Sequence, residues 1–265
     1  MESKVALVTG ASSGFGKLTA EHLLAAGYRV FGTSRKPRSH ESVEMLQLDV
    51  QSDDSVEACV TELIARAGRI DLLVNNAGQI HASVVEETSL DVARDVFETN
   101  FWGVVRVTRA VLPFMRRQKS GHIINVGSLA GLIGVPGQGF YSASKFALEG
   151  YSETLAIELT PFGIGVSLIE PGFFRTSLHE GMSSSARRID DYDAIRSGIE
   201  QSIARSIEGG DDPVKVAHAI VQVAKSGSAR LRHRVGDDAR WVPRFKSILP
   251  ERFFRRAILS RFSVK

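Results

Sequence analysis

A phenol and an amine stand four residues apart in segment 140–148, at Tyr141 and Lys145. On a helix this spacing places both side chains on one face, side by side. A tyrosine side chain has a pKa of about 10, and a neighbouring ammonium lowers that pKa because it stabilises the phenolate. Such a tyrosine can exchange a proton with an alcohol or a ketone. The alternative is a structural pair, with the ring half-buried and the lysine in solvent.

A glycine-rich turn near the start of the chain follows a short apolar run at residues 5–9 and precedes a helical pattern. The turn places glycines at Gly10, Gly14 and Gly16. Glycines let the backbone approach a pyrophosphate closely, and the free N–H groups and dipole at the helix start favour its negative charge. Strand, turn and helix in this order are the context that such a motif requires. We therefore expect the turn to bind phosphate.

The residue that meets an adenosine ribose lies about twenty positions beyond such glycines. An acidic residue there would accept a hydrogen bond from a 2′-hydroxyl, but the sequence reads T-S-R-K at 33–36 and the nearest carboxylate is Glu41. Ser34 and Arg35 suit a 2′-phosphate instead, because arginine binds phosphate through two N–H groups. The sequence thus favours NADP over NAD. Alternatively, Arg35 and Lys36 only solvate the loop.

Apolar runs alternate with helical patterns along most of the chain, as is typical of an α/β protein with a parallel sheet and helices on both faces. Strands are expected at 5–9, 28–33, 43–48, 72–74, 122–126, 166–169 and 231–235. Helices are expected at 52–67, from about 90 to 117, at 140–160 and after Asp212, which would be an N-cap with Pro213 at the first helical position. Ligands of such sheets bind beyond the carboxyl ends of the strands. Asp49 follows one strand and is placed to accept a hydrogen bond from an adenine amino group.

The composition limits the class of protein. A chain of 265 residues with 43% hydrophobic and 24% charged residues fits one soluble globular domain. A single cysteine, Cys59, excludes an intrachain disulfide and a zinc site built on thiolates, and it fits a reducing compartment. We see neither a signal-peptide core nor an apolar run of the roughly eighteen residues that a membrane span needs. We therefore expect a cytoplasmic protein.

The positive charge is concentrated near the C-terminus. Residues 229–265 hold eleven basic and three acidic residues, a formal charge of +8 in a chain whose net charge is only +3. The pattern predicts short helices broken by Pro243 and Pro250 that mix aromatic residues with arginines. Basic amphipathic helices can lie on anionic membranes. Alternatively, residues such as Phe253 and Phe254 pack on the body or on a partner subunit. No nucleic-acid-binding motif is present, so we expect no nucleic acid partner.

Taken together, the motifs resemble the short-chain dehydrogenase/reductase family, most closely its hydroxysteroid and retinol dehydrogenase-like branch. They are T-G-A-S-S-G-F-G at 9–16, N-N-A-G at 75–78, Asn100, Ser128, Y-S-A-S-K at 141–145 and P-G at 171–172. The resemblance covers about residues 5–235. It implies a single Rossmann-type doubly wound sheet of about seven strands, and a homodimer or homotetramer formed through the helices that contain Asn100 and Tyr141. We place the catalytic domain at 1–238 and a basic helical extension at 239–265.

The resemblance also implies roles for individual residues. Ser128 would hydrogen-bond the substrate oxygen, and Tyr141 would give or take its proton. Lys145 would lower the pKa of Tyr141 and hold the nicotinamide ribose, while Asn100 would help to position a water through its main chain. The expected cofactor-binding residues are Gly10, Ser12, Ser13, Gly14, Phe15, Gly16, Ser34, Arg35, Asp49, Val50, Asn76, Ala77, Gly78, Tyr141, Lys145, Pro171, Gly172 and Thr176, and no metal site is expected.

The substrate side is predicted from position along the chain. Segment 131–136, Phe140 and segment 173–210 should bound the pocket, and they force no arginine, lysine or histidine into it. This favours a hydrophobic secondary alcohol, ketone or aldehyde over an anionic or sugar substrate. Isoleucines at every fourth position from 195 to 207 form one apolar stripe. The stripe is typical of a mobile lid helix within 173–210, or equally of a surface helix packed on the core.

Two functions remain open at this point. The first is an NADP-dependent oxidoreductase that transfers a hydride to or from an alcohol or carbonyl carbon. The second is a catalytically silent NADP-binding redox sensor or scaffold. The presence of Tyr141, Lys145 and Ser128 favours the first, because a sensor has no need of a group that transfers protons.

Overall fold

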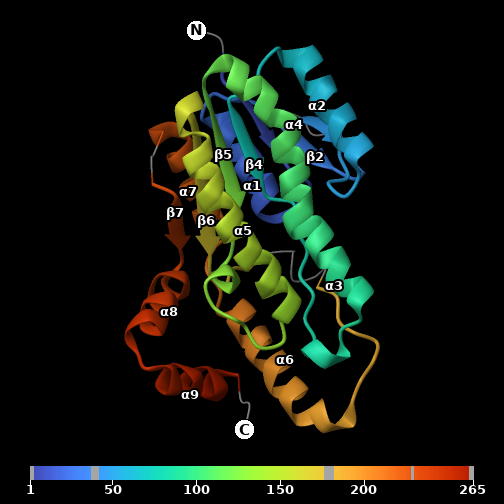
Figure 1. Ribbon diagram of the computed structural model, residues 1–265, viewed down its shortest axis with the longest axis vertical. Helices are drawn as coiled ribbons and strands as arrows, with labels where there is room; N and C mark the ends of the chain where they lie inside the picture. Colours follow the sequence, from blue (N-terminus) through green and yellow to red (C-terminus); the bar gives the residue numbers. More distant parts are fainter. Residues whose placement is uncertain (1–2, 37–41, 176–181, 228–229, 263–265) are drawn as a thin grey trace.

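The computed structural model describes residues 3–36, 42–175, 182–227 and 230–262. Seven parallel strands form one sheet in the order β3-β2-β1-β4-β5-β6-β7 (Figure 1). This order confirms the predicted doubly wound α/β fold, whose switch point lies between β1 and β4. The strands are β1 (Val5–Val8), β2 (Arg29–Ser34), β3 (Glu44–Gln47), β4 (Leu72–Asn75), β5 (Gly121–Val126), β6 (Ile164–Pro171) and β7 (Arg232–Val235).

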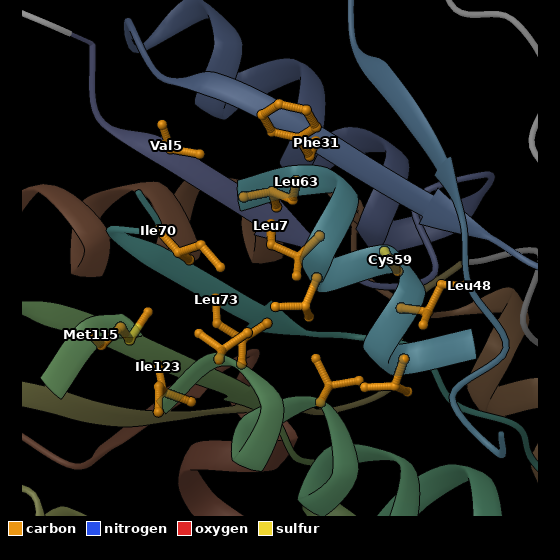
Figure 2. Close-up of a cluster of buried hydrophobic side chains, with 14 of the residues drawn as sticks. Val5, Leu7, Phe31, Leu48, Cys59, Leu63, Ile70, Leu73, Met115 and Ile123 are labelled. Atoms are coloured by element: carbon orange, nitrogen blue, oxygen red, sulfur yellow. The ribbon is translucent and has the colours of Figure 1, made fainter. Parts of the chain in front are cut away.

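Side chains alternate between the two faces of the sheet and form two separate cores. In β1, Leu7 packs into the core under α2 (Asp53–Ala67), α4 (Gly103–Gln118) and α5 (Gly139–Glu158). Figure 2 shows this cluster. Val8, the next residue, packs into the opposite core, which α1 (Gly14–Ala25) and α7 (Val214–Ser226) cover. The central strands β1 and β4 are therefore apolar at nearly every position, because both of their faces are buried, whereas the edge strands β3 and β7 are more polar and partly exposed.

The starts of α2 and α7 follow the capping signals in the sequence. The Ser52 hydroxyl accepts a hydrogen bond from the backbone N–H of Ser55 at 3.2 Å. α7 begins at Val214, slightly later than expected, so that Pro213 is its N-cap. The Asp212 carboxylate still accepts a hydrogen bond from the Val214 N–H at 2.9 Å. Both side chains satisfy N–H groups that have no partner inside the helix.

The helix expected from about 90 to 117 is divided. α3 (Leu90–Phe97) and α4 are joined by a π-helical turn, Glu98–Trp102, that contains Asn100. The Asn100 amide is fully buried, where it accepts a hydrogen bond from the Gln79 N–H and donates to the Gln79 carbonyl, both at 2.9 Å, and to the Ser144 hydroxyl at 3.2 Å. An extra residue per turn aims a side chain that an ideal helix would direct elsewhere. The local pattern of polar and apolar residues contains no sign of this turn.

The C-terminal segment differs from the expectation at one proline. Pro243 does not break a helix but lies inside α8 (Asp237–Ile248), whereas Pro250 does separate α8 from α9 (Glu251–Arg261). A proline has helical φ, so a helix that packs against the body can retain it at the cost of one backbone hydrogen bond. In Figure 1 the arrowheads of β6 and β7 point toward the end of the molecule that carries α6 (Asp193–Glu208), α8 and α9. The site must therefore lie at this end.

Candidate active site

Tyr141 and Lys145 lie on one buried face of α5, as the spacing predicts. Tyr141 is 7% and Lys145 6% exposed, and the Lys145 Nζ is 5.9 Å from the centroid of the tyrosine ring. The Lys145 Nζ donates a hydrogen bond to the Val126 carbonyl at 2.8 Å, which anchors it to the end of β5. Ser128, two residues further along, lines one small cavity with Tyr141 and lowers the pKa of its phenol. The three side chains thus meet where β5 ends.

The pKa of Tyr141 differs from the expectation. Burial raises the pKa of the Tyr141 phenol above its ordinary value of 10.0, and Ser128 only partly opposes this effect. Burial also lowers the pKa of Lys145 to about 8, against the Glu149 carboxylate, which raises it. The net shift of the Tyr141 pKa is therefore upward, opposite to the expectation, because desolvation outweighs the effect of Ser128. That Lys145 lowers this pKa stays a prediction. Tyr141 is protonated at neutral pH, as a proton donor to a carbonyl oxygen must be.

A cavity of about 280 Å³ lies at the carboxyl ends of the strands, at the switch point of the sheet. Gly10 and Gly14, which form its glycine turn, have φ values of 66° and 52°, a conformation that favours glycine. Twelve of the predicted cofactor-binding residues line this cavity: Gly10, Ser12, Ser13, Gly14, Phe15, Ser34, Arg35, Asp49, Val50, Asn76, Ala77 and Gly78.

The residues of this cavity fit a dinucleotide. The Ser34 hydroxyl is buried and has no hydrogen-bond partner within the described residues, although it lines the cavity beside Arg35. A buried hydroxyl without a partner is costly unless a ligand satisfies it. Gly14 and Phe15, the first residues of α1, line the same space, and the N–H groups without a partner at a helix start favour a phosphate. Among the described residues that line the cavity, Asp49 is the only acidic one.

Gly16 and Asn76 stabilise the conformation of the glycine turn. Gly16 does not line the cavity, and a Cβ added to it would lie 2.2 Å from the Gly10 carbonyl oxygen and 2.4 Å from the Asn76 Nδ2. The Asn76 Nδ2 donates hydrogen bonds to the carbonyls of Thr9 and Gly10, at 2.9 and 3.2 Å. The third glycine of the turn therefore allows α1 to pack closely against β1 and β4.

Some lining residues have no counterpart among the predicted ones: Thr33, Leu48, Gln51, Gln79 and Thr99. Thr33 and Leu48 lie at the ends of β2 and β3, where the rule that ligands bind beyond strand ends would have found them. Gln51 reaches the cavity because its side chain donates to the Thr99 hydroxyl at 2.8 Å. That bond joins segments far apart in the sequence and leaves no local signal.

A smaller cavity of about 70 Å³ lies beside Tyr141 and Ser128. Pro171 and Gly172, both predicted to bind the cofactor, line it, and Phe15 lines both this cavity and the larger one. The nicotinamide end of a dinucleotide is therefore expected here, next to Tyr141. Thr176, also predicted to bind the cofactor, lies outside the described residues.

The apolar stripe on α6 packs into the hydrophobic cluster that contains Tyr141, but none of its isoleucines lines the smaller cavity. Ile199 and Ile203 are 7% and 2% exposed, and they belong to the same hydrophobic cluster as Tyr141. Val135, within the predicted wall 131–136, belongs to the cluster and lines the cavity. From the rest of the predicted wall, Phe173 also lines the cavity, whereas Phe140 does not. That α6 moves as a lid stays a prediction.

Comparison with known proteins agrees with this geometry. The family model for short chain dehydrogenases matches residues 4–187. A 3-ketodihydrosphingosine reductase of Bacteroides thetaiotaomicron is 39% identical over 270 residues, covering 100% of both chains. Retinol dehydrogenase 8 of Bos taurus is 36% identical and covers 91% of this chain and 83% of its own.

A solved structure shares the fold. It is a short chain dehydrogenase/reductase from Burkholderia phymatum in complex with NAD, with a TM-score of 0.81, 25% identity and 93% of each chain covered. The family model thus covers most of the chain, and the Bacteroides thetaiotaomicron relative matches all of it. This protein belongs to the short-chain dehydrogenase family of oxidoreductases, which act on CH–OH and carbonyl groups.

Proposed function

We propose that this protein transfers a hydride between NADP(H) and a hydrophobic secondary alcohol, ketone or aldehyde, with Tyr141 as the general acid or base. The observation that carries the proposal is the buried Tyr141 phenol, which lines a small cavity together with Ser128. Phe15 lines both this cavity and the dinucleotide cavity. A proton donor beside a nicotinamide site is what carbonyl reduction needs.

The residues act on the substrate oxygen. When bound, the cofactor supplies or accepts the hydride. Ser128 donates a hydrogen bond to the substrate oxygen and orients it toward Tyr141. In reduction, the Tyr141 hydroxyl gives its proton to that oxygen as negative charge develops there; in oxidation, it takes the proton back. Lys145, whose ammonium lies on the same face of α5, stabilises the phenolate that remains.

Asn100 holds a position from which proton exchange with solvent can be organised. Its buried side chain ties the loop after β4 to α5 through Gln79 and Ser144. We propose that its main chain positions a water that connects Lys145 to solvent and returns the proton to Tyr141. The hydrogen bonds of the side chain hold that main chain in place.

The cofactor preference follows from the end of β2. Ser34 and Arg35 line the dinucleotide cavity there, and the buried Ser34 hydroxyl has no partner within the described residues. A hydroxyl and a guanidinium suit a 2′-phosphate, whereas a carboxylate at this position would repel it. NADP(H) is therefore the proposed cofactor. The NAD bound to the Burkholderia phymatum protein does not transfer to this chain, because the two are only 25% identical.

The substrate class follows from the walls of the smaller cavity. Leu129, Val135, Phe173 and Phe174 line it, and no charged side chain of the described residues does. An apolar cavity binds apolar surface and excludes ions. The Bacteroides thetaiotaomicron relative, which matches along its whole length, is itself named as the reductase of a ketone.

The proposal is tested by NADPH oxidation with steroid, retinoid and aliphatic carbonyl compounds. Tyr141→Phe should lower kcat by about 10²–10⁴-fold while the protein still binds NADPH, because only the hydroxyl is removed and the other cofactor-binding residues stay in place. Tyr151→Phe, on the same helix but in the core under α4 and α5, is the matched control and should retain activity. NADPH binding without turnover of any carbonyl would instead support the silent sensor or scaffold. Full activity in Tyr141→Phe would show that Tyr141 is not the general acid or base.

The outer faces of α4 and α5 support a homodimer or homotetramer. Phe146 and Ile157 on α5 are 41% and 72% exposed, and Trp102, directly before α4, is 47% exposed. Large apolar side chains on adjoining helices favour burial against another subunit. Light scattering on the eluted protein measures the subunit number, and a monomer would contradict this proposal.

The last two helices support weak, peripheral association of a cytoplasmic protein with an anionic membrane. Phe254 and Ile258 pack on the body, but Trp241, Phe245 and Phe253 are exposed among arginines. Such a surface binds anionic lipid through both charge and apolar contact. No helix in the described ranges is long and apolar enough to cross a bilayer. Phe245→Ser should weaken co-sedimentation with anionic vesicles, and unchanged sedimentation would contradict the proposal.

A further inference from the structure

A larger cavity lies beyond the apolar wall of the site. It has a volume of about 410 Å³ and is bounded by the loop after β5, by α6 and by the C-terminal helices α8 and α9. Leu129, Val135 and Phe173 line both this cavity and the one beside Tyr141. Since the same side chains border both spaces, a single layer of side chains separates them.

The inner part of the larger cavity is apolar. Ile133 from the loop after β5, Val242 from α8 and Ile258 from α9 line it, together with the buried Phe262. These residues belong to the hydrophobic cluster that includes Tyr141. One continuous cluster of apolar side chains thus extends from Tyr141 to the C-terminal helices. The part of the cavity that lies against this cluster suits hydrocarbon.

The outer part of the cavity is charged. The exposed residues Arg205 from α6, Asp237 from α8 and Arg261 from α9 line it, together with the half-buried Asp211 and Asp238. The Arg261 guanidinium is held at the rim by a hydrogen bond to the Ser206 hydroxyl at 2.8 Å. An apolar interior with a charged rim fits a ligand whose chain is buried while its far end reaches water.

We propose that the cavity between α6, α8 and α9 holds the aliphatic chain of the substrate. This inference rests on the proposed function and narrows it: the substrate is a long-chain ketone or secondary alcohol, with its reacting carbon at Tyr141 and its chain running past Leu129, Val135 and Phe173. A flexible chain can pass between three side chains that shift slightly. A rigid fused-ring system cannot, so the geometry favours an aliphatic substrate over a steroid.

The hydrogen bonds that hold Phe173 leave its ring free to move aside for the substrate chain. Its backbone N–H donates to the Asp238 carboxylate at 2.8 Å, and its carbonyl accepts from the Asp211 N–H at 3.2 Å. Both bonds involve the main chain, so the ring can change rotamer without breaking them. Asp238 lies in the first turn of α8. The wall between the cavities is thereby tied to the helix that lines the proposed chain site.

The test uses unbranched methyl ketones of increasing chain length with NADPH. In the unmodified protein, kcat/KM should rise by about fourfold for each methylene that enters the cavity, from about 0.8 kcal/mol per buried methylene. Val242→Trp and Ile258→Trp fill the cavity from two different helices, and each should lower the ratio of kcat/KM for the longest to that for the shortest ketone. Ile248→Trp, on the same helix as Val242 but 77% exposed, is the matched control and should leave this ratio unchanged.

Calorimetric binding of the same ketones to the protein with NADP⁺ separates this inference from the proposed function. If no ketone is turned over but Kd still falls with chain length, and Val242→Trp abolishes that trend, the chain site stands and the proposed reaction is wrong. If ketones are turned over but neither kcat/KM nor Kd depends on chain length, the chain site is wrong and the proposed reaction stands. A Val242→Trp protein with unchanged melting temperature and an unchanged length dependence also overturns the chain site.

Discussion

The dinucleotide cavity and the cavity between α6, α8 and α9 lie at the same end of the sheet but are built differently. The first is lined by small and polar residues at the ends of β1 to β4 and at the start of α1, several of them glycines. The second is lined largely by side chains of helices and of the loop after β5. The first therefore depends on backbone conformation and tolerates little change, whereas the second can be reshaped one side chain at a time.

The largest effect on NADPH binding is expected at Gly16, where an added side chain would clash with the backbone. A Cβ on residue 16 would lie 2.2 Å from the Gly10 carbonyl oxygen, which cannot rotate away as a side chain can. Gly16→Val should therefore displace the start of α1 and raise the Kd for NADPH by at least about a hundredfold. Gly150→Ala is the control, because a Cβ there meets nothing within 4 Å, and NADPH binding should be unchanged. Unchanged NADPH binding in Gly16→Val would contradict the claim that the dinucleotide cavity depends on backbone conformation.

A smaller effect is expected at the end of β2, where a side chain and not the backbone selects the cofactor. Arg35→Ser removes the guanidinium from the cavity, and the ratio of kcat/KM for NADPH to that for NADH should fall by about tenfold or more. The physical reason is the loss of a charge-assisted hydrogen bond to the 2′-phosphate. Lys36, also exposed, does not line the cavity, so Lys36→Ser should leave the ratio near its original value. Equal use of both cofactors by the unmodified protein would contradict the preference itself.

The smallest effect concerns Lys145, which is buried beside Tyr141 and lines neither cavity. The Glu149 carboxylate, one turn further along α5, raises the pKa of Lys145 against the burial that lowers it to about 8. Glu149→Gln should lower that pKa further, so that the ammonium is lost at a lower pH. The alkaline decline of kcat should therefore move to lower pH, as a pH–rate profile would show.

Glu153→Gln is the matched control for this shift. Glu153 also pairs with Arg232, at 2.7 Å, but its side chain is 58% exposed, so its charge is screened by water. The pH–rate profile of Glu153→Gln should therefore match that of the unmodified protein. A Glu149→Gln profile identical to that of the unmodified protein would show that the charge of Lys145 does not govern the alkaline limb.

The parts that the sequence predicted share a local origin. The glycine turn, the strand ends and the Tyr141–Lys145 spacing are patterns within a few residues, and all twelve predicted residues that line the dinucleotide cavity belong to such patterns. The alternation of apolar strands with helices was enough for the parallel sheet, since helices must cover both of its faces. Pro250 ended a helix as expected, because little in the fold opposes its local preference.

The tertiary structure alone decided the rest. Asn100 lies in a π-helical turn because Gln79 and Ser144 come within hydrogen-bonding distance of its side chain. Burial reversed the expected shift of the pKa of Tyr141. The cavity between α6, α8 and α9 arises where helices from distant parts of the chain meet. Desolvation and long-range packing depend on which segments meet in space, and a local pattern of residue types does not contain that information.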